Sequence, residues 1–484
     1  MKYDFDIERK PAISQIVPFR APDGTPYADV YIAGRRETVP IRGKSLARRI
    51  QHGHYLRNGS PMKPAALKEH LAGLEAEADF HGVERDVFLR TARYNDRLYI
   101  DLCDAAWRAI EIDRMGWRIV AKSPVRFLRS SATRALPEPV SGGSIDELWK
   151  FVRIADPGDQ TLVVAHLLSI LGAVQPTPIL YLVGGQGTAK SAATALLRRL
   201  VDPNVVGLKT LPRSEQDLFV AAQQSRVLSF DNLSDISNPM SDALCRIVTG
   251  GAFGSRRYWT HGEEAILAAC NPIICNGITM AFTRPDLLDR TICVRVDKLR
   301  DGDRKPNTEI SSDFDRAHPA MLGALCTALS NGLAQESKVA LPSLPRMADF
   351  AAWALACEAG FAAGPGILDA YHKNIEAAVE DAVDDDDVGK RIRNLMTLGA
   401  IWEGTATMLD DALRRASVTP VPRSWPGSPR ALADHLRRLE PALAKLLVEI
   451  SFARKGHNRE RVITISMPSD RASQREPIGQ AAST

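Results

Sequence analysis

The stretch from residue 177 to residue 191 limits most strongly what this chain can fold into. It reads Thr-Pro-Ile-Leu-Tyr-Leu-Val-Gly-Gly-Gln-Gly-Thr-Ala-Lys-Ser, an apolar strand that runs into a glycine-rich turn ending with Lys190 and Ser191. The backbone N–H groups of such a turn can surround phosphate oxygens at the start of a helix. We predict a P-loop in which Lys190 contacts the β- and γ-phosphates of ATP and Ser191 is a Mg²⁺ ligand. The residues expected around the nucleotide are Gly184, Gly185, Gln186, Gly187, Thr188, Ala189, Lys190, Ser191 and Ala192.

The glycines of this turn are expected to supply its backbone conformation. Gly184, Gly185 and Gly187 can take positive φ and aim their N–H groups inward. The usual pattern also has glycine directly before the lysine, and this chain has Ala189 there. Alanine fits if the backbone is already helical at that point, and helix formers follow from Ala192 to Leu200. The alternative is a chance glycine-rich turn, because glycines alone are a weak signal; the preceding strand and the Lys-Ser pair favour the nucleotide site.

Composition restricts the class of protein. A chain of 484 residues is expected to form about three domains. With 45% hydrophobic and 25% charged residues it is globular, and a net charge of +4 is too small to establish nucleic-acid binding, so any basic surface must be local.

The cysteines and the apolar runs indicate a compartment. The seven cysteines include no CxxC pair and no zinc-binding spacing, so we expect reduced core thiols in a cytoplasmic protein, in a bacterial or phage-infected cell. The N-terminus lacks an apolar signal region, and the longest apolar stretch, residues 161–174, is too short to cross a bilayer. No membrane association is expected.

Turn and capping signals divide the chain before the P-loop. Residues 1–135 are expected to form a β-rich domain with one helix at 64–78, followed by a proline- and glycine-containing linker. Ser144 and Glu147 form a capping box that opens a helix, and a second helix at 159–174 leads into the P-loop strand.

Four features follow the P-loop helix. A buried strand from Arg226 ends at Asp231, about 40 residues after the lysine, which is typical of a Walker B carboxylate that holds Mg²⁺. Residues 255–266 are expected to form a hairpin with basic and aromatic strands, and another buried strand ends at Asn276. The sequence Pro-Asp-Leu-Leu-Asp-Arg, ending at Arg290, precedes a further strand.

This order resembles that of AAA+ ATPases with a hairpin before the sensor-1 strand, above all superfamily 3 and MCM helicases. The loop Gly-Gln-Gly-Thr-Ala-Lys-Ser is similar to the MCM phosphate loop, which accommodates Ala189. Phe-Asp-Asn-Leu-Ser at 230–234 and Cys-Asn-Gly-Ile at 275–278 resemble replicative-helicase-like ATP-binding proteins of phages and mobile elements. The resemblance implies an α/β AAA+ core with a five-stranded parallel sheet at residues 144–310 and a helical lid at 311–385.

The same resemblance implies roles for individual residues. Lys190 and Ser191 would bind ATP and Mg²⁺, Asp231 would hold the metal, Asn276 would act as sensor 1, and Arg290 would be an arginine finger. Because such a finger acts on a neighbouring subunit, a homo-oligomer, most simply a hexamer, follows.

Other roles stay open for the arginines of this region. Arg290 can instead be a helix-end arginine paired with Asp286 or Asp289. Arg284 is a second candidate for the finger, and Arg346 is a candidate for sensor 2 or a surface arginine.

One chemically important position departs from the resemblance. Most AAA+ members have an acidic residue after the Walker B aspartate to position water, and this chain has Asn232. An amide can orient water but cannot accept its proton. Three alternatives follow. Hydrolysis is slow, or Asp235 or Glu263 helps to position the attacking water, or Asp231 both holds the metal and positions the water.

The C-terminal part predicts a second DNA-contacting region. Residues 386–468 are expected to contain a helix from Ile401 through Leu413, a helix that starts at Ser428 and a basic hairpin, the order of a winged helix. Use of the fold for protein contacts is the alternative, and the tail at 469–484 is expected to be disordered. The expected duplex-binding residues are Arg430, Arg437, Arg438, Arg454, Lys455 and Arg459.

Two classes of function fit these features. The first is an ATP-driven hexameric DNA helicase or translocase that replicates a phage or mobile element, with Arg256, Arg257 and His261 moving a single strand through the ring. The second is a DNA-binding switch, such as an initiator, loader or defence ATPase, in which ATP controls assembly. The hairpin favours the first and Asn232 favours the second.

Overall fold

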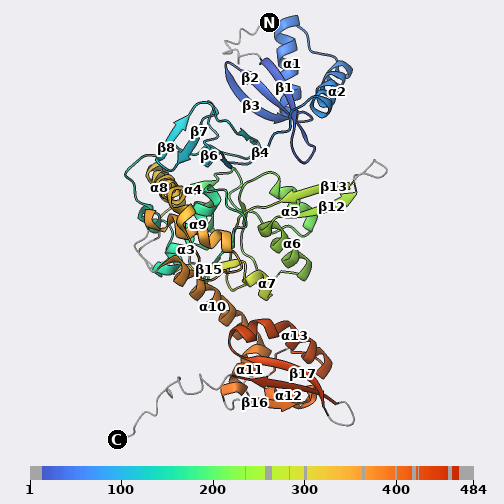
Figure 1. Ribbon diagram of the computed structural model, residues 1–484, viewed down its shortest axis with the longest axis vertical. Helices are drawn as coiled ribbons and strands as arrows, with labels where there is room; N and C mark the ends of the chain where they lie inside the picture. The colour runs from blue at the N-terminus through green and yellow to red at the C-terminus, as the bar shows by residue number, and fades with distance from the viewer. Residues whose placement is uncertain are drawn as a thin grey trace.

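The computed structural model describes residues 13–467 apart from 235, 257–263, 283, 299–301, 303, 362–365, 398–400, 417–420, 423–424 and 456–459. Its ribbon is elongated, with the N-terminal sheet at one end, a parallel sheet with its helices in the middle and a small α/β unit at the other end (Figure 1). Among the described residues, no helix is long and apolar enough to cross a membrane.

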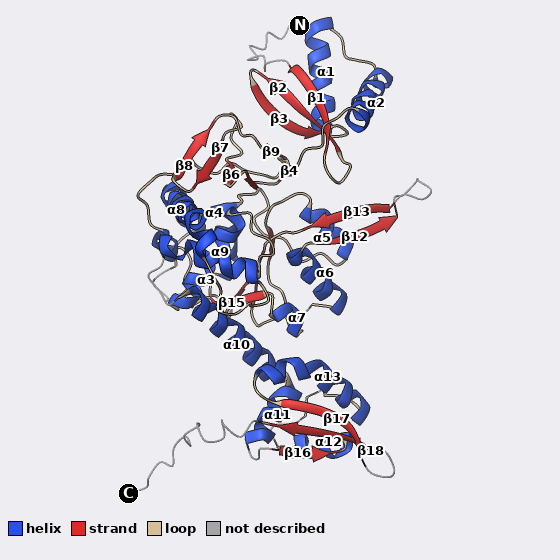
Figure 2. Ribbon diagram, viewed as in Figure 1, coloured by secondary structure: helices blue, strands red, loops and turns tan. Residues whose placement is uncertain are grey.

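The N-terminal unit is a three-stranded antiparallel sheet with two helices (Figure 2). Val30, Ile41 and Leu46 form part of its own hydrophobic core. Only the second of its helices was expected from the sequence, because the first is rich in Arg and His and has few apolar positions. The elements are β1 (Ile13–Arg20), β2 (Pro26–Ile32), β3 (Arg35–Pro40), α1 (Lys44–Asn58) and α2 (Pro64–Phe80).

A second antiparallel sheet, of order β5-β6-β7-β8, belongs to a different core. Its buried residues, such as Ile100 and Ile112, share the large central core with the helix at residues 157–171, which precedes the glycine-rich turn and its strand. The expected boundary at residue 135 therefore does not coincide with a boundary between hydrophobic cores. These strands are β5 (Thr91–Tyr94), β6 (Arg97–Asp101), β7 (Ala109–Asp113) and β8 (Gly116–Val120), with the short pair β4 (Val87–Phe88) and β9 (Arg126–Phe127) beside them.

The segment expected to be a linker is packed rather than free. The Val140 N–H donates to the carbonyl of Pro319 at 2.9 Å, and a Cβ on Gly143 would collide with the backbone of Ala320. Ser144 then caps a short 3₁₀ helix, η1 (Ile145–Lys150), by accepting from the Asp146 N–H.

The central sheet has four parallel strands in the order β11-β14-β10-β15. The expected fifth strand is reduced, among the described residues, to a parallel bridge between Lys209 and Phe230 beside β11. The strands are β10 (Ile179–Val183), β11 (Leu228–Phe230), β14 (Ile273–Gly277) and β15 (Thr291–Arg295). The helices around them are α3 (Pro157–Leu171), α4 (Lys190–Val201), α5 (Glu215–Ala222), α6 (Asn238–Thr249) and α7 (Pro285–Leu288).

A β-hairpin is inserted in the chain between α6 and β14. Its strands β12 (Gly251–Arg256) and β13 (Glu264–Ala269) pair antiparallel and project away from the core in Figure 1. A hairpin at this point in the chain was expected from the sequence; its tip lies outside the described residues.

Three helices after β15 connect the central core to the C-terminal unit: α8 (Asn307–Gln335), α9 (Ala348–Cys357) and α10 (Ile367–Asp385). Helix α10 belongs to two cores. Ile367 and Tyr371 near its start are buried in the central core, whereas Val379 and Val383 near its end are buried in the C-terminal core.

The C-terminal unit has the order helix, strand, two helices and hairpin. Ile401–Gly404 is a strand rather than the start of a helix, and Thr405 then caps the following helix. Ser428 caps the last helix as expected. The elements are α11 (Asp387–Thr397), β16 (Ile401–Gly404), α12 (Ala406–Arg415), α13 (Pro429–Lys445), β17 (Glu449–Lys455) and β18 (Glu460–Ser466), with sheet order β16-β18-β17.

Candidate nucleotide-binding site

The glycine-rich turn joins β10 to α4 at the carboxyl edge of the parallel sheet, as predicted. Of its three glycines only Gly187 has a positive φ, 78°. Gly184 is required for a different reason, because a Cβ there would lie 2.8 Å from the carbonyl oxygen of Val296. Gly185 meets no close neighbour, so the expectation of positive φ at all three glycines is wrong for Gly184 and Gly185.

Ala189 has a left-handed backbone, with φ 59° and ψ 26°, directly before α4. The condition under which alanine was expected to fit, a backbone that is already helical at this point, is therefore not met. The turn needs this conformation to bring Lys190 back toward Gly185, and a Cβ makes it costly, by about 1–2 kcal/mol.

Lys190 is folded back onto its own loop. Its ammonium donates to the Gly185 carbonyl at 2.7 Å, and Thr188 Oγ1 donates to the same carbonyl at 3.0 Å. Lys190 is 9% exposed, and burial lowers the pKa of its ammonium against the opposing attraction of Asp231. Asp231 is thus close enough to act on the charge of Lys190. One cation and one carboxylate therefore lie together beside the glycine-rich turn.

Asn276 connects three elements of the site. Its buried amide nitrogen donates to Asp231 Oδ1 at 2.9 Å and to Thr194 Oγ1 at 3.0 Å. Its oxygen accepts the Asn232 N–H at 3.1 Å, and Thr194 donates in turn to the Lys190 carbonyl at 2.8 Å. The ends of β11 and β14 and the first turn of α4 therefore form one hydrogen-bonded unit.

Two site residues were not predicted. Thr194 lies one turn after Lys190 and is fully buried; its spacing of four was the available signal. Arg304, in the exposed segment before α8, brings Nη2 to 3.8 Å from the place a Gly187 Cβ would occupy. Only tertiary structure could reveal this second cation at the turn.

Other expected residues differ in their surroundings. Ser191 and Asn232 are exposed, and Asn232 has φ 53°. The two carboxylates expected to assist it, Asp235 and Glu263, lie outside what the structure describes.

A cavity of about 590 Å³ adjoins the glycine-rich turn. Gly184, Gly185 and Gln186 form one side of it, and carboxylates near the end of α10, including Asp381 and Asp384, form another. The space beside the turn is therefore bounded by the helix that enters the C-terminal unit.

Arg290 has the arrangement of the structural alternative rather than that of a free finger. Its side chain is 9% exposed and pairs with Asp286 through the carboxylate and through the backbone carbonyl at 2.5 Å. Burial acts to raise the pKa of Asp286, but the hydrogen bonds from Arg290 and Cys245 and the charges of Arg290 and Arg346 together outweigh burial and lower that pKa. Arg346 shares the same carboxylate at 3.1 Å, and the more exposed Arg284 pairs with Asp242 at 2.5 Å.

This arginine cluster lies at the opposite edge of the sheet from the turn. The Arg290 carbonyl accepts the N–H of Ile179, the first residue of β10, at 2.7 Å. A strand of five residues separates the two edges, about 16 Å. Arg290 is therefore too far away to contact phosphates held at its own chain's turn.

The residues expected to contact DNA divide into two groups. Arg256 lies at the end of β12, but nothing is described of its side chain, and Arg257, His261 and Arg459 lie outside the described residues. Exposed side chains are found at the remaining positions, namely Arg430, Arg437, Arg438, Arg454 and Lys455.

Two of these cations have ion-pair partners within the C-terminal unit. Arg437 pairs with Asp434 at 2.8 Å and lies over the ring of Phe452. Lys455 pairs with Glu403 at 2.8 Å. Even so, residues 405–468 hold eleven Lys or Arg against six Asp or Glu, so this segment carries more net charge than the +4 of the whole chain.

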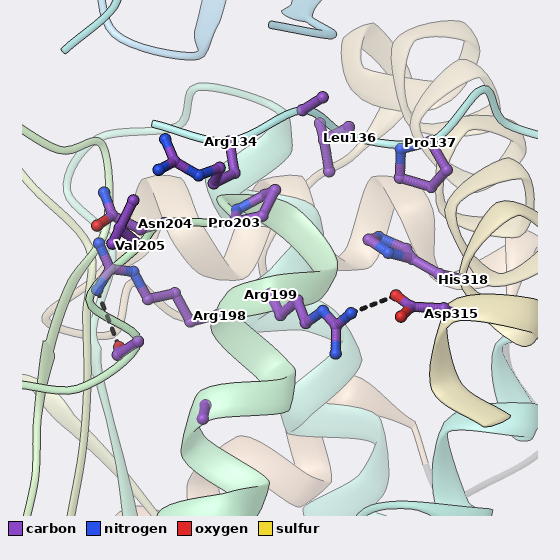
Figure 3. Close-up of a pocket in the computed structure, with 13 residues that line it drawn as sticks. Arg134, Leu136, Pro137, Arg198, Arg199, Pro203, Asn204, Val205, Asp315 and His318 are labelled. Carbon is purple, nitrogen blue, oxygen red and sulfur yellow. Dashed lines mark hydrogen bonds and ion pairs between the residues drawn. The ribbon is translucent and has the colours of Figure 1, made fainter. Parts of the chain in front are cut away.

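A second cavity, of about 600 Å³, lies at the far end of α4 (Figure 3). Arg198 and Arg199, which line it, already have hydrogen-bond and ion-pair partners within the fold. Arg198 donates to the carbonyls of Val206 and Gly207 at 2.7 and 2.9 Å, and Arg199 pairs with Asp315 of α8. Their hydrogen bonds fix the end of α4 to its neighbours, which leaves the turn at the start of α4 as the nucleotide-site candidate.

Two sequence models of one family match consecutive parts of the chain. The model of the actinomycete integrative conjugative element replication protein matches residues 145–385, and that of the C-terminal domain of the same family's RepA matches residues 388–479. The chain belongs to this family of replication proteins. The resemblance to replication proteins of mobile elements is thus confirmed. The first match contains the glycine-rich turn, and neither match includes residues 1–144.

Solved structures match this family member over most of its length, at low sequence identity and with TM-scores below 0.5. The structure titled "SCCmec type IV Cch - active helicase" is 11% identical, covers 93% of both chains and has a TM-score of 0.47. The structure titled "The A form apo structure of NrS-1 C terminal region-CTR" is 10% identical, covers 94% of this chain and 96% of the other, and has a TM-score of 0.41. No functional argument rests on likenesses of this size. No curated protein matches the sequence.

Proposed function

We propose that this replication protein is an ATP-dependent DNA helicase or translocase with an AAA+ core. The observation that carries the proposal is the hydrogen-bonded unit of Asp231, Asn276 and Thr194 beside Lys190, because one amide connects the ends of two parallel strands to the helix after a glycine-rich turn. A terminal phosphate placed there would be sensed by all three elements at once. That coupling is what conversion of nucleotide state into movement requires.

The residues present suit a Mg²⁺–nucleotide pair. Lys190 can exchange the Gly185 carbonyl for phosphate oxygens, since both are oxygen acceptors. Ser191 and Asp231 offer the hard oxygen donors that Mg²⁺ prefers, and Mg²⁺ would neutralise charge that develops on the phosphates. Arg304 supplies a second cation near Gly187.

Completion of the site from a second copy is part of the proposal. Arg290 is about 16 Å from its own turn, so it can reach phosphates only on another chain, and Arg284 lies directly before the same short helix, α7. Arg284 is favoured as the arginine that does so, because its side chain is 38% exposed while Arg290 is buried on Asp286. A closed ring, most simply a hexamer, satisfies every such interface.

Two surfaces are proposed to contact DNA. The hairpin of β12 and β13, together with Arg256 and with Arg257 and His261 of the sequence between the two strands, would hold a single strand and move with the nucleotide state. The C-terminal unit, whose order of elements is that of a winged helix, would place α13 and the β17–β18 hairpin on duplex phosphates.

A second candidate function is an ATP-controlled DNA-binding switch. Asn232 favours it, because an exposed amide follows Asp231 where a carboxylate would accept a proton from water. In that case ATP would control assembly and turnover would be slow.

The deciding measurement is ATP turnover by the purified full chain with and without single-stranded DNA. We expect DNA to stimulate turnover, and Lys190→Ala to lower it at least about 100-fold, because the ammonium is the main charge offered to the terminal phosphates. Lys338→Ala, which removes an exposed lysine from another part of the chain, is the control and should leave turnover unchanged. Full activity in a folded Lys190→Ala variant would exclude the nucleotide site; ATP binding with negligible turnover would favour the switch.

A further inference from the structure

Charge is segregated between two consecutive segments of the N-terminal unit, which neither family model matches. Residues 35–63, which include β3 and α1, hold eight Lys or Arg and a single acidic residue, Glu37. Residues 64–84, which include α2, hold one lysine and five Asp or Glu. The unit therefore has a basic helix and an acidic helix, and a polyanion would approach it from the α1 side.

Half of the eight cations are occupied within the fold. Arg35 and Arg49 pair with Glu37, and Arg42 pairs with Glu75. Arg36 donates to the carbonyls of Ser123 and Val125, both at 2.7 Å. The other four are exposed and have no ion pair with any residue that the structure describes: Lys44, Arg48, Arg57 and Lys63.

The geometry of α1 places two of these cations on one outward face. Leu46, Ile50 and Gly53 are buried against the sheet. Lys44 and Arg48 are one turn apart, about 6 Å along the axis, and project from the opposite side of the helix. That face bears no acidic residue, so it offers uncompensated charge to solvent.

An aromatic side chain continues the same face. Tyr55 follows Lys44 by eleven residues, which is close to three full turns, and it is 54% exposed. An exposed tyrosine in line with cations suits a ligand that combines phosphates with flat apolar groups. Single-stranded nucleic acid has this combination, because its bases are free to stack.

We propose that the outer face of α1 is a single-stranded DNA-binding surface, in which Lys44 and Arg48 contact neighbouring phosphates and Tyr55 stacks on a base. This surface lies at the end of the molecule farthest from the C-terminal unit (Figure 1). It is separate from the proposed hairpin and winged-helix contacts and does not depend on ATP hydrolysis.

The test measures binding of the full chain, without nucleotide, to a fluorescent oligothymidylate and to a duplex of equal length at several salt concentrations. Lys44→Ala with Arg48→Ala should weaken single-strand binding roughly tenfold near physiological salt and reduce the slope of log affinity against log salt by about 1.4. Tyr55→Ala should weaken it at least about fivefold without changing the slope, and Tyr55→Phe should restore it.

The matched control removes two exposed lysines outside this face, Lys68→Ala with Lys338→Ala. Equal weakening by the control would overturn the proposal, since overall charge would then explain the effect. Unchanged binding in the α1 variants, or an equal loss for duplex and single strand with no effect of Tyr55→Ala, would also overturn it. Arg437→Ala with Arg438→Ala provides the contrasting arm and should reduce duplex binding alone. Because binding is measured without nucleotide, these expected binding results would still hold if the ATPase proposal failed.

Discussion

At the scale of single residues, Ala189 combines an L side chain with a left-handed backbone at the start of α4. Ala189→Gly removes that conflict, and the gain exceeds the extra entropy of glycine in the unfolded chain, so we expect stabilisation by about 1 kcal/mol. The denaturant concentration at the midpoint of unfolding of the central core measures this change in stability. Ala195→Gly, in the right-handed interior of the same helix, should instead destabilise by about 0.5–1 kcal/mol. Destabilisation by both changes would mean that the native turn does not keep this conformation in solution.

Asn232 gives the second residue-scale prediction. Its exposed side chain follows Asp231, and aspartate tolerates the same left-handed backbone. If proton transfer from water limits turnover, Asn232→Asp supplies the missing acceptor and should raise the rate about tenfold or more. Steady-state ATP turnover in the presence of single-stranded DNA measures the effect.

Asn232→Ala serves as the control because it removes the amide without adding a carboxylate, and it should not accelerate turnover. An Asn232→Asp rate equal to that of the wild type would show that water is activated elsewhere.

The sequence predicted site residues whose signal is local and missed those placed by packing. Lys190, Asp231 and Asn276 each end a strand or open a helix, and the carboxyl ends of parallel strands meet at one edge of a sheet. Arg304 reaches the turn from a segment whose course depends on α8. The φ of Ala189 depends on closure of the whole turn, so residue type alone gave the wrong conformation.

At the scale of elements, amphipathic and capped helices were predicted well, whereas a helix rich in arginine and histidine and a short strand were not. α13 begins after its Ser428 cap as expected. α1 was not predicted because arginine and histidine fill five of its fifteen positions and few apolar residues mark its buried face. β16 was predicted as the start of a helix, since it has only four residues and the Thr405 cap follows it directly. The fifth strand of the central sheet was implied by resemblance and is represented, in the part of the chain that the structure describes, by a bridge at Lys209.

Asp159 ties three elements together near the C-terminal end of the central sheet. Its carboxylate accepts the N–H of Arg295 in the last position of β15 and the amide of Asn374 in α10, both at 3.2 Å. Burial raises the pKa of Asp159 to about 6, and the nearby Asp156 adds to the effect. The folded state therefore favours the protonated form of Asp159 more than the unfolded state does.

The sign of the resulting pH dependence follows from proton counting. Between the unfolded pKa near 3.9 and the folded pKa of about 6, the native state binds the extra proton, so this group's contribution to stability falls as pH rises. Asp159→Asn keeps the shape without the titration. We expect the variant to gain stability relative to the wild type as pH rises from 4 to 7, measured by urea midpoints. Asp411→Asn, at an exposed position, is the control, and a difference independent of pH would contradict the assignment.

At the scale of the whole molecule, the two end units connect to the core differently. The N-terminal unit keeps a hydrophobic core of its own. The C-terminal unit shares α10 with the central core, and Lys445 of α13 pairs with Asp289 directly after α7. A change at the arginine cluster or beside the glycine-rich turn therefore has a short physical route to the C-terminal unit, through α7 or α10.

The same arrangement makes a prediction about subunits, because the arginine cluster and the glycine-rich turn lie at opposite edges of one sheet. Arg284→Ala should spare ATP binding and suppress turnover, since the stabilising cation is lost at the neighbouring site. Mixed with Lys190→Ala, it should recover activity, because an intact Lys190 then faces an intact Arg284 at about a quarter of randomly formed interfaces. Steady-state turnover of the mixture, with mass measured in solution, is the readout.

Two controls make this mixing experiment decisive. Arg316→Ala removes an arginine that is 73% exposed on α8, and it should leave turnover unchanged. Arg290→Ala should lower stability rather than turnover alone, because it leaves the carboxylate of Asp286 without its buried partner. If Arg290→Ala stays stable and recovers activity on mixing while Arg284→Ala does not, Arg290 moves out of its pocket and is the acting arginine. If neither mixture recovers and the mass is that of one chain, the site is completed within a single copy, and both the trans-acting arginine and the ring are excluded.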